Sequence, residues 1–164
     1  MPLRADQIDV ECPFEATELL YRRVSKDGLN SASELLPSEL STFSFNKNID
    51  SAPSVLRSAF CEPTDALALE CSEGKDVSNW LVFAIAVGEL PTPLEAGDGR
   101  FFETYPVHRP LPLCGAHSVI ASSVVGGNTR VYSPPPRSVK NALRTKLATR
   151  FKPVTLARSA TTTA

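Results

Sequence analysis

Short runs of hydrophobic residues, separated by turn-forming residues, recur along the chain and predict β-strands. Residues 17–24 predict a first strand. Residues 54–60 and 66–71 predict two short extended segments, divided by a turn at Glu62-Pro63-Thr64. The unbroken hydrophobic run at 80–87 predicts a strand that is buried on both faces and therefore central in a sheet.

The β pattern continues beyond this run. Residues 118–125 predict another strand, and Gly126-Gly127-Asn128 predicts a hairpin turn into a short strand at 129–132. Residues 106–112 hold too many prolines for a helix or a central strand and predict an extended surface loop. Residues 32–36 predict a single helical turn before Pro37.

The C-terminal part of the chain predicts an amphipathic helix after a stiff spacer of three prolines at 134–136. Ser138 is the predicted N-cap, and Pro153 ends the helix. Hydrophobic residues recur every four positions, at Val139, Leu143, Leu147 and Phe151. The cations Lys140, Arg144, Lys146 and Arg150 fall largely off this stripe and predict a basic face.

Together these patterns predict an α+β fold: a small mixed, mainly antiparallel sheet with few helices and a C-terminal amphipathic basic helix. We expect an α+β domain over 1–133, followed over 134–164 by the spacer, the helix and a frayed tail. With 164 residues and 42% hydrophobic content, the chain can bury a core without a disulfide or a metal.

Hydropathy predicts a cytoplasmic protein that makes no contact with a membrane. The longest hydrophobic run is far shorter than the roughly 20 residues that a spanning helix needs, and no hydrophobic segment follows the first arginine. The cysteines Cys12, Cys61, Cys71 and Cys114 match neither paired zinc ligands nor a dense disulfide framework, and we expect reduced, mostly buried thiols. A metal site built from Cys114 and both histidines is an alternative, but its spacing fits no common zinc module, so no metal or cofactor is predicted.

Charge is distributed unevenly along the chain. Residues 1–103 carry 18 acidic and 8 basic residues, whereas residues 104–164 carry 9 basic residues and no acidic one. This asymmetry predicts an interaction module that binds a protein or a nucleic acid through an acidic body and the basic helix. Alternatively, the helix packs its hydrophobic face on its own domain and its cations face water or the acidic body.

Both histidines, His108 and His117, lie within ten positions of each other and next to Arg109. Two imidazoles beside a guanidinium could manage proton transfer and hold an anionic group, with Ser118 or Cys114 as the nucleophile. Alternatively, the histidines cap strand ends by hydrogen bonding. No nucleophile elbow, phosphate-binding loop, dinucleotide turn or zinc-protease helix is present, so whether the chain is an enzyme stays open.

Arg22 and Arg23 are adjacent in the first predicted strand and therefore point to opposite faces. A strand-borne arginine can bind a phosphate or carboxylate through its two-pronged guanidinium group, although such residues are more often solvated or ion-paired. Ser58 could contact the same ligand or serve as a turn hydroxyl. We therefore regard Arg22, Arg23, Arg109 and Ser58 as candidate anion-binding residues.

The chain resembles a widespread group of short, uncharacterised bacterial proteins in three segments: Leu20-Tyr21-Arg22-Arg23-Val24, Ser58-Ala59-Phe60, and Val107-His108-Arg109-Pro110-Leu111-Pro112 followed by Ala116-His117-Ser118. This resemblance implies a bacterial protein and a shared role for His117. More distantly, Arg22 or Arg23 and Ser58 are similar to the first two motifs of ADP-ribosyltransferase-like domains. The acidic third motif of that family is missing, because no Asp or Glu follows Glu103.

Two hypotheses follow from these features. The first is a small interaction module of a bacterial multi-protein system, with a protein partner or a nucleic acid bound through Lys140, Arg144, Lys146 and Arg150. The second is a histidine-dependent enzyme that handles phosphoryl groups or nucleotides, such as a nuclease, a phosphodiesterase or an ADP-ribosyltransferase-like protein. In the second, His117 and His108 are the acid and base.

Overall fold

The computed structural model describes residues 1–37, 52–91, 94–125 and 133–156. Its strands are β1 (Leu19–Val24), β2 (Ser54–Arg57), β3 (Leu81–Ala86), β4 (Leu94–Glu95), β5 (Phe101–His108), β6 (His117–Val124) and β7 (Lys152–Pro153). The α-helix α1 spans Arg137–Arg150, and short 3₁₀ helices include η1 (Ala5–Gln7), η2 (Lys26–Gly28), η5 (Pro63–Leu67) and η6 (Val87–Glu89).

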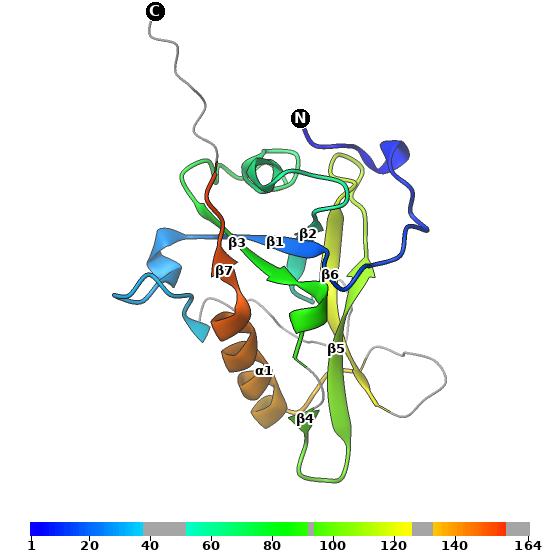
Figure 1. The fold of residues 1–164 in the computed structure, drawn as a ribbon, viewed down its shortest axis with the longest axis vertical. Helices are drawn as coiled ribbons and strands as arrows, with labels where there is room; N and C mark the ends of the chain where they lie inside the picture. The colour runs from blue at the N-terminus through cyan, green and yellow to red at the C-terminus, as the bar shows by residue number, and fades with distance from the viewer. Residues whose placement is uncertain (38–51, 92–93, 126–132, 157–164) are drawn as a thin grey trace, which may run out of the picture.

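The strands form one seven-stranded sheet in the order β4-β5-β6-β2-β1-β3-β7. Each pairing between these described strands is antiparallel. The sheet curls, so that β1 and β3 run across the molecule in Figure 1 while β5 and β6 run down it. The predicted α+β class is therefore confirmed in its coarse form, with far more sheet than helix in the described chain.

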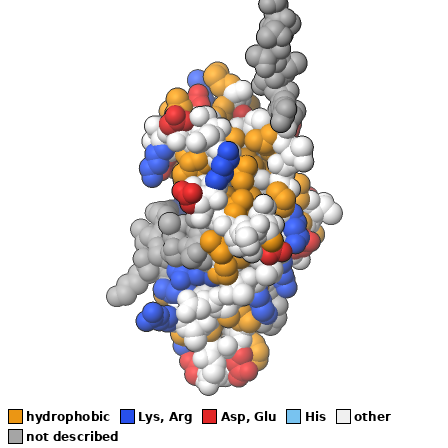
Figure 2. Space-filling model, turned by 90° about the vertical axis from the view of Figure 1, so that its left-hand side faces the viewer, with side chains coloured by type: hydrophobic (Ala, Val, Ile, Leu, Met, Phe, Trp, Pro, Cys, Tyr) orange, Lys and Arg blue, Asp and Glu red, His pale blue; other side chains and the backbone are white. Residues whose placement is uncertain are grey.

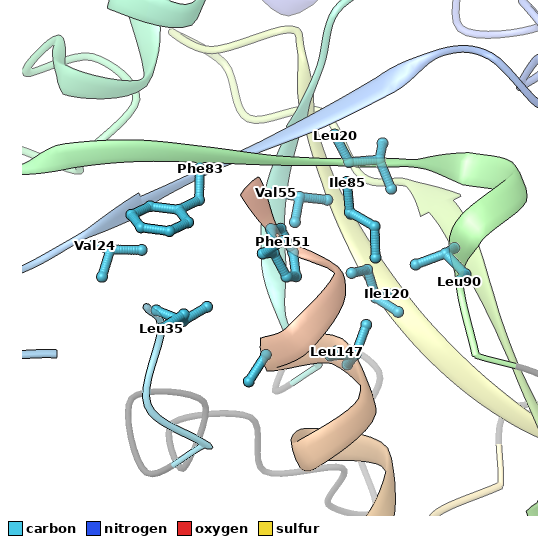
Figure 3. Close-up of a cluster of buried hydrophobic side chains, with 11 residues drawn as sticks. Leu20, Val24, Leu35, Val55, Phe83, Ile85, Leu90, Ile120, Leu147 and Phe151 are labelled. Carbon is cyan, nitrogen blue, oxygen red and sulfur yellow. The ribbon is translucent and has the colours of Figure 1, made fainter. Parts of the chain in front are cut away.

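Helix α1 covers one face of the sheet, and its hydrophobic stripe is buried there. Figure 3 shows Leu147 and Phe151 pointing from the C-terminal part of the helix toward Leu20 and Ile85 of the sheet. Further toward its N-terminus, Val139 and Leu143 pack on Phe102 of β5. The helix is consequently part of the core, which agrees with the alternative prediction that it packs its hydrophobic face on its own domain.

Truncating Leu147 to alanine is expected to lower the free energy of unfolding by about 2–5 kcal/mol, because the fully buried side chain would leave a cavity between helix and sheet. Thr145→Ala, on the exposed side of the same helix, is the matched control with little expected effect. Urea unfolding of both variants measures the difference. A Leu147→Ala variant as stable as the control would show that the helix does not carry the core.

The opposite face of the sheet packs on a second cluster, which holds a disulfide between Cys71 and Cys114. Both cysteines are almost fully buried. The prediction of four reduced thiols is therefore wrong for this pair, because the fold brings together two cysteines 43 residues apart. Cys12 and Cys61 are free and half-buried, and burial next to acidic groups raises the pKa of the Cys61 thiol to about 12.

Three sequence predictions match described strands: 17–24 with β1, the start of 54–60 with β2, and 118–125 with β6. The segment 80–87 forms β3 and is buried inside, as predicted, but it lies beside the edge strand β7 and not at the centre. Both of its faces are covered, one by α1 and the other by the disulfide cluster. The strand is buried because a layer covers each face of the sheet at this position. A hydrophobic run in the sequence reports such burial, but it does not report how far the strand lies from the edge of the sheet.

The extended segment predicted at 66–71 is wrong. Pro63 begins the 3₁₀ helix η5 and Asp65 accepts a hydrogen bond from the Glu62 N–H, after which the chain continues in turns. The helical turn predicted at 32–36 is also wrong, because the Asn30 side chain accepts hydrogen bonds from the backbone of Ala32 and Glu34 and builds a tight turn there.

The loop predicted at 106–112 begins later than expected, since β5 continues through Pro106 to His108. The described part of β4 pairs with Phe101 and Phe102 and does not extend to Pro106. Pro106 therefore lies at an edge of the described sheet, where its missing N–H group interrupts no strand pairing on that side. Pro136, and not Ser138, is the N-cap of α1. The hairpin and strand predicted at 126–132 lie outside the described residues.

Candidate active site

A cavity of about 530 Å³ opens between the end of the β5–β6 hairpin and the turn that follows η5. We call it the Ser54 cavity. Its lining residues are Ser54, Glu73, His108, Arg109, Pro110, Leu111, His117 and Val119. The site therefore combines a hydroxyl, a carboxylate, a guanidinium and imidazole with a partly apolar wall.

Ser54, His117 and Arg109 form a chain of hydrogen bonds at this cavity. The Ser54 Oγ lies 3.2 Å from His117 Nε2, and His117 Nδ1 lies 2.6 Å from the Arg109 carbonyl oxygen. Strand pairing explains the proximity, because Ser54 begins β2 and His117 begins β6, and these strands are hydrogen-bonded neighbours. A hydroxyl, an imidazole and an orienting acceptor are thus aligned in that order.

The carbonyl fixes the tautomer of His117. A carbonyl oxygen only accepts hydrogen bonds, so Nδ1 carries the proton, and Nε2 of the neutral ring is left to accept the Ser54 hydroxyl proton. Burial is the main effect that lowers the pKa of His117 below its ordinary value. The hydrogen bond to the Arg109 carbonyl and the charge of Glu73 oppose this shift, whereas the positive charges of Arg23 and Arg109 add to it. At neutral pH the ring is therefore a neutral base facing a hydroxyl.

Charged groups surround this hydrogen-bonded pair. Arg109 lines the cavity, and Arg23 lies close enough to influence the pKa of His117. Arg23 Nη1 donates to the Cys71 carbonyl oxygen at 2.8 Å, and its pKa is lowered by burial while Glu73 opposes that shift. Two guanidinium groups against one carboxylate leave the neighbourhood of His117 positive, which favours an anionic ligand.

The two histidines contact different hydroxyl groups. His108 lies opposite Ser118 across β5 and β6, and its Nδ1 is 3.2 Å from the Ser118 Oγ. His117 precedes Ser118 in the same strand, so its side chain leaves the other face of the sheet. Both imidazoles nevertheless open onto one cavity beside Arg109, as the enzyme hypothesis predicted, and the pairing of His108 with His117 as acid and base stays a prediction.

His108 has a structural environment. Its ring centre lies 5.6 Å from that of Phe60, and its buried Nε2 has no hydrogen-bond partner among the described residues. Its pKa is lowered, first by burial and then by the charge of Arg57. Neither of the predicted nucleophiles is available, because Ser118 is fully buried and the sulfur of Cys114 is bonded to Cys71.

Sequence reasoning missed Ser54. It lies 63 residues before His117 in the chain, and no local motif links the two. The available signal was its position at the start of a predicted strand, where a hydroxyl can emerge at the end of a sheet. Only the pairing of β2 with β6 makes it a partner of His117.

The other predicted anion-binding residues are engaged within the fold. Arg22 and Arg23 point to opposite faces as predicted, and Arg22 Nη1 donates to the Ser54 carbonyl oxygen at 3.0 Å. The Ser58 Oγ accepts the Leu19 N–H at 3.0 Å, which continues the pairing of β1 beyond β2. Of the four candidates, Arg109 lines the cavity and Arg23 lies beside it.

The predicted partner-binding cations all lie in α1: Lys140, Arg144, Lys146 and Arg150. At about 100° per residue, the first two flank one side of the buried stripe and the last two flank the other. Arg150 Nη1 donates to the Glu89 carbonyl oxygen at 2.7 Å, so this cation binds its own domain. In Figure 2 the blue basic side chains lie in several places on the face shown, with red acidic side chains among them.

The face of α1 turned away from the core is uncharged. It carries Asn141, Thr145 and Thr149, all of which are exposed. The four cations lie off the hydrophobic stripe, as predicted, but they flank it on two sides and do not gather on the face opposite the core.

Within the described ranges, no cluster of three or more His, Cys, Asp or Glu side chains could hold a metal ion. Over the same ranges, no helix is long and apolar enough to cross a membrane. Comparisons of the chain with protein-family models, with curated proteins and with solved structures found no match.

Proposed function

We propose that this chain is a hydrolase that cleaves small esters carrying a negative charge, with Ser54 as nucleophile and His117 as general base. The observation that carries the proposal is the chain from the Ser54 hydroxyl through His117 to the Arg109 carbonyl at the edge of a cavity. A nucleophile bonded to a base, which is itself oriented by a third group, is the general arrangement of covalent catalysis.

The proposed reaction has two steps. In the first, Ser54 Oγ bonds to the acyl carbon or phosphorus of the ester, His117 Nε2 takes the hydroxyl proton, and the leaving alcohol receives that proton. In the second, water attacks the ester on Ser54, Nε2 takes a proton from the water, and the proton returns to Ser54 Oγ as the acid is released. The Arg109 carbonyl, which stays bonded to Nδ1, stabilises the imidazolium formed in each step.

Arg109 supports an anionic substrate. A guanidinium at the cavity wall can bind a carboxylate or a phosphate in a two-pronged contact, and Arg23 adds a second positive charge nearby. This choice agrees with the phosphoryl-handling hypothesis drawn from the sequence, with Ser54 in place of His108 as the partner of His117.

The interaction module stays a second prediction with less support. It rests on the uneven distribution of charge along the chain, and it is weakened because the hydrophobic stripe of α1 is buried in the core. A cytoplasmic location and a bacterial origin also stay predictions. The Cys71–Cys114 disulfide favours an oxidising compartment over the reducing cytosol, where such bonds are rare.

A fluorophosphonate probe, which reacts covalently with activated serines, tests the proposal without knowledge of the natural substrate. We expect labelling of the wild-type chain at Ser54, identified by peptide mass spectrometry, and its loss in Ser54→Ala and His117→Ala. Ser138→Ala, which removes an exposed helical hydroxyl, should label like wild type.

Chromogenic carboxylate and phosphate esters, offered with and without a second negative group, then identify the ester class. Folded protein that labels nowhere, or labels equally after Ser54→Ala, would overturn the proposed function. Thermal unfolding of each variant shows whether it is folded.

A further inference from the structure

The Cys71–Cys114 disulfide joins the two walls of the Ser54 cavity. On one wall, Cys71 stands two residues before Glu73, and its carbonyl accepts a hydrogen bond from Arg23 at 2.8 Å. On the other, the Cys114 carbonyl accepts the His117 N–H at 3.2 Å and pairs with Leu111. One covalent bond therefore connects the segment that carries Glu73 to the segment that carries the proposed base.

Cys71 and the preceding helix η5 pack on the sheet, but the residues that follow Cys71 in this wall are tied to it by few described hydrogen bonds. Between 68 and 75, the backbone hydrogen bonds described outside regular elements run between residues of the turn itself. The Ser72 hydroxyl also bonds within the turn, to Leu69 and Lys75. The Arg23 hydrogen bond ties this turn to β1, and the disulfide ties it to the segment on the other side of the cavity.

The backbone of this turn is also strained. Glu73 has φ of 55° and Gly74 has φ of 82°, so a residue with a side chain sits in the left-handed region. Such a residue is held there only when its surroundings fix it. The disulfide two residues earlier is placed to supply that restraint.

We propose that the Cys71–Cys114 disulfide is a positioning element of the active site, which holds Glu73 and His117 at the correct separation across the cavity. The inference rests on the proposed function. A dithiol reductant would transfer two electrons and two protons to the bond, giving two cysteine thiols and the oxidised reductant. The walls would then separate, and turnover at Ser54 would fall while the sheet stays folded.

The test compares fluorophosphonate labelling before and after treatment with dithiothreitol, with mass spectrometry confirming reduction. Cys12→Ser/Cys61→Ser keeps the disulfide and lacks the free thiols, so it is the matched control that should respond like wild type. Cys71→Ala/Cys114→Ala should be slow under both conditions. We expect reduction to slow labelling at least tenfold in the wild-type protein and in Cys12→Ser/Cys61→Ser.

Two further measurements separate positioning from general stability. Amide hydrogen exchange should rise on reduction at 68–75 and 109–117 and stay unchanged in the strands β1 and β3. The acid limb of the labelling rate should move to higher pH, because His117 loses burial.

Exchange or labelling that is unchanged in fully reduced protein overturns the inference, as does exchange that rises throughout the chain. Protein that never labels, even oxidised, refutes the proposed function. In that case the exchange data alone decide whether the disulfide positions the cavity walls.

Discussion

Replacing Arg57 by methionine is expected to lower the free energy of unfolding by about 3–5 kcal/mol, because the change leaves Glu18 buried without its counterion. Arg57 is fully buried in β2, and its Nε and Nη2 donate to the two Glu18 carboxylate oxygens at 2.8 and 2.9 Å. Its remaining donors reach the carbonyl oxygens of Cys12 and Pro13 at 2.9 Å. One side chain thus ties the N-terminal segment to the sheet.

Two aromatic rings enclose the same guanidinium. Its carbon lies 3.8 Å from the ring centre of Phe14 and 4.9 Å from that of Phe60. Such contacts strengthen where water is excluded, so part of the expected loss is cation–π attraction as well as ion pairing. Methionine retains the bulk of the aliphatic stem but replaces neither interaction.

Urea unfolding measures this prediction, with Arg100→Met as the matched control. Arg100 also pairs with a carboxylate, that of Asp98, but about half of each side chain is exposed, and water replaces the pair at little cost. The double variant Glu18→Leu/Arg57→Met should recover part of the loss, since it leaves no unpaired buried charge. An Arg57→Met chain as stable as the Arg100→Met chain would contradict the argument.

The second large effect concerns His117. Replacement by alanine is expected to slow modification of Ser54 by about 10²–10⁴-fold, the usual contribution of a general base. In the wild-type protein the rate should fall as the pH drops through the lowered pKa of His117, because a protonated Nε2 cannot accept the Ser54 proton. That midpoint lies below the ordinary histidine value of 6.5.

The pH profile of the labelling rate checks this assignment. The decrease in rate at low pH should persist in His108→Phe and disappear in His117→Ala. Of the two histidines, it is His117 that contacts the Ser54 hydroxyl. If the decrease in rate at low pH is lost in His108→Phe, the titrating group is His108 and the assignment to His117 is wrong. The same lowered pKa means that, between the folded pKa and 6.5, the folded state binds fewer protons than the unfolded state. The free energy of unfolding should therefore increase as the pH is raised through this range.

Local patterns predicted the elements that depend on neighbouring residues. The spacing of Val139, Leu143 and Leu147 predicted α1, and the hydrophobic runs at 17–24 and 118–125 predicted β1 and β6. These predictions succeeded because the period of side-chain direction is a property of the backbone itself. The segment 66–71 failed because the proline-initiated turn before it outweighed its alternating pattern.

The candidate site was found only in part. Clustering in the sequence identified His117 and Arg109, and both line the Ser54 cavity. It also identified His108, which lines the same cavity but is hydrogen-bonded to Ser118, whereas His117 is hydrogen-bonded to Ser54. Closeness in sequence therefore identified residues of the cavity, whereas the strand register decided which hydroxyl each ring contacts.

By itself, the sequence determined the α+β class, the amphipathic helix and the presence of chemistry-bearing residues near 108–117, since each follows from composition or local periodicity. Only the tertiary structure decided that Cys71 pairs with Cys114, that Arg57 is buried on Glu18 and that Ser54 meets His117. Each of those contacts joins residues 39 to 63 positions apart. Strand order and register bring such residues together, and neither is encoded in any short stretch of the chain.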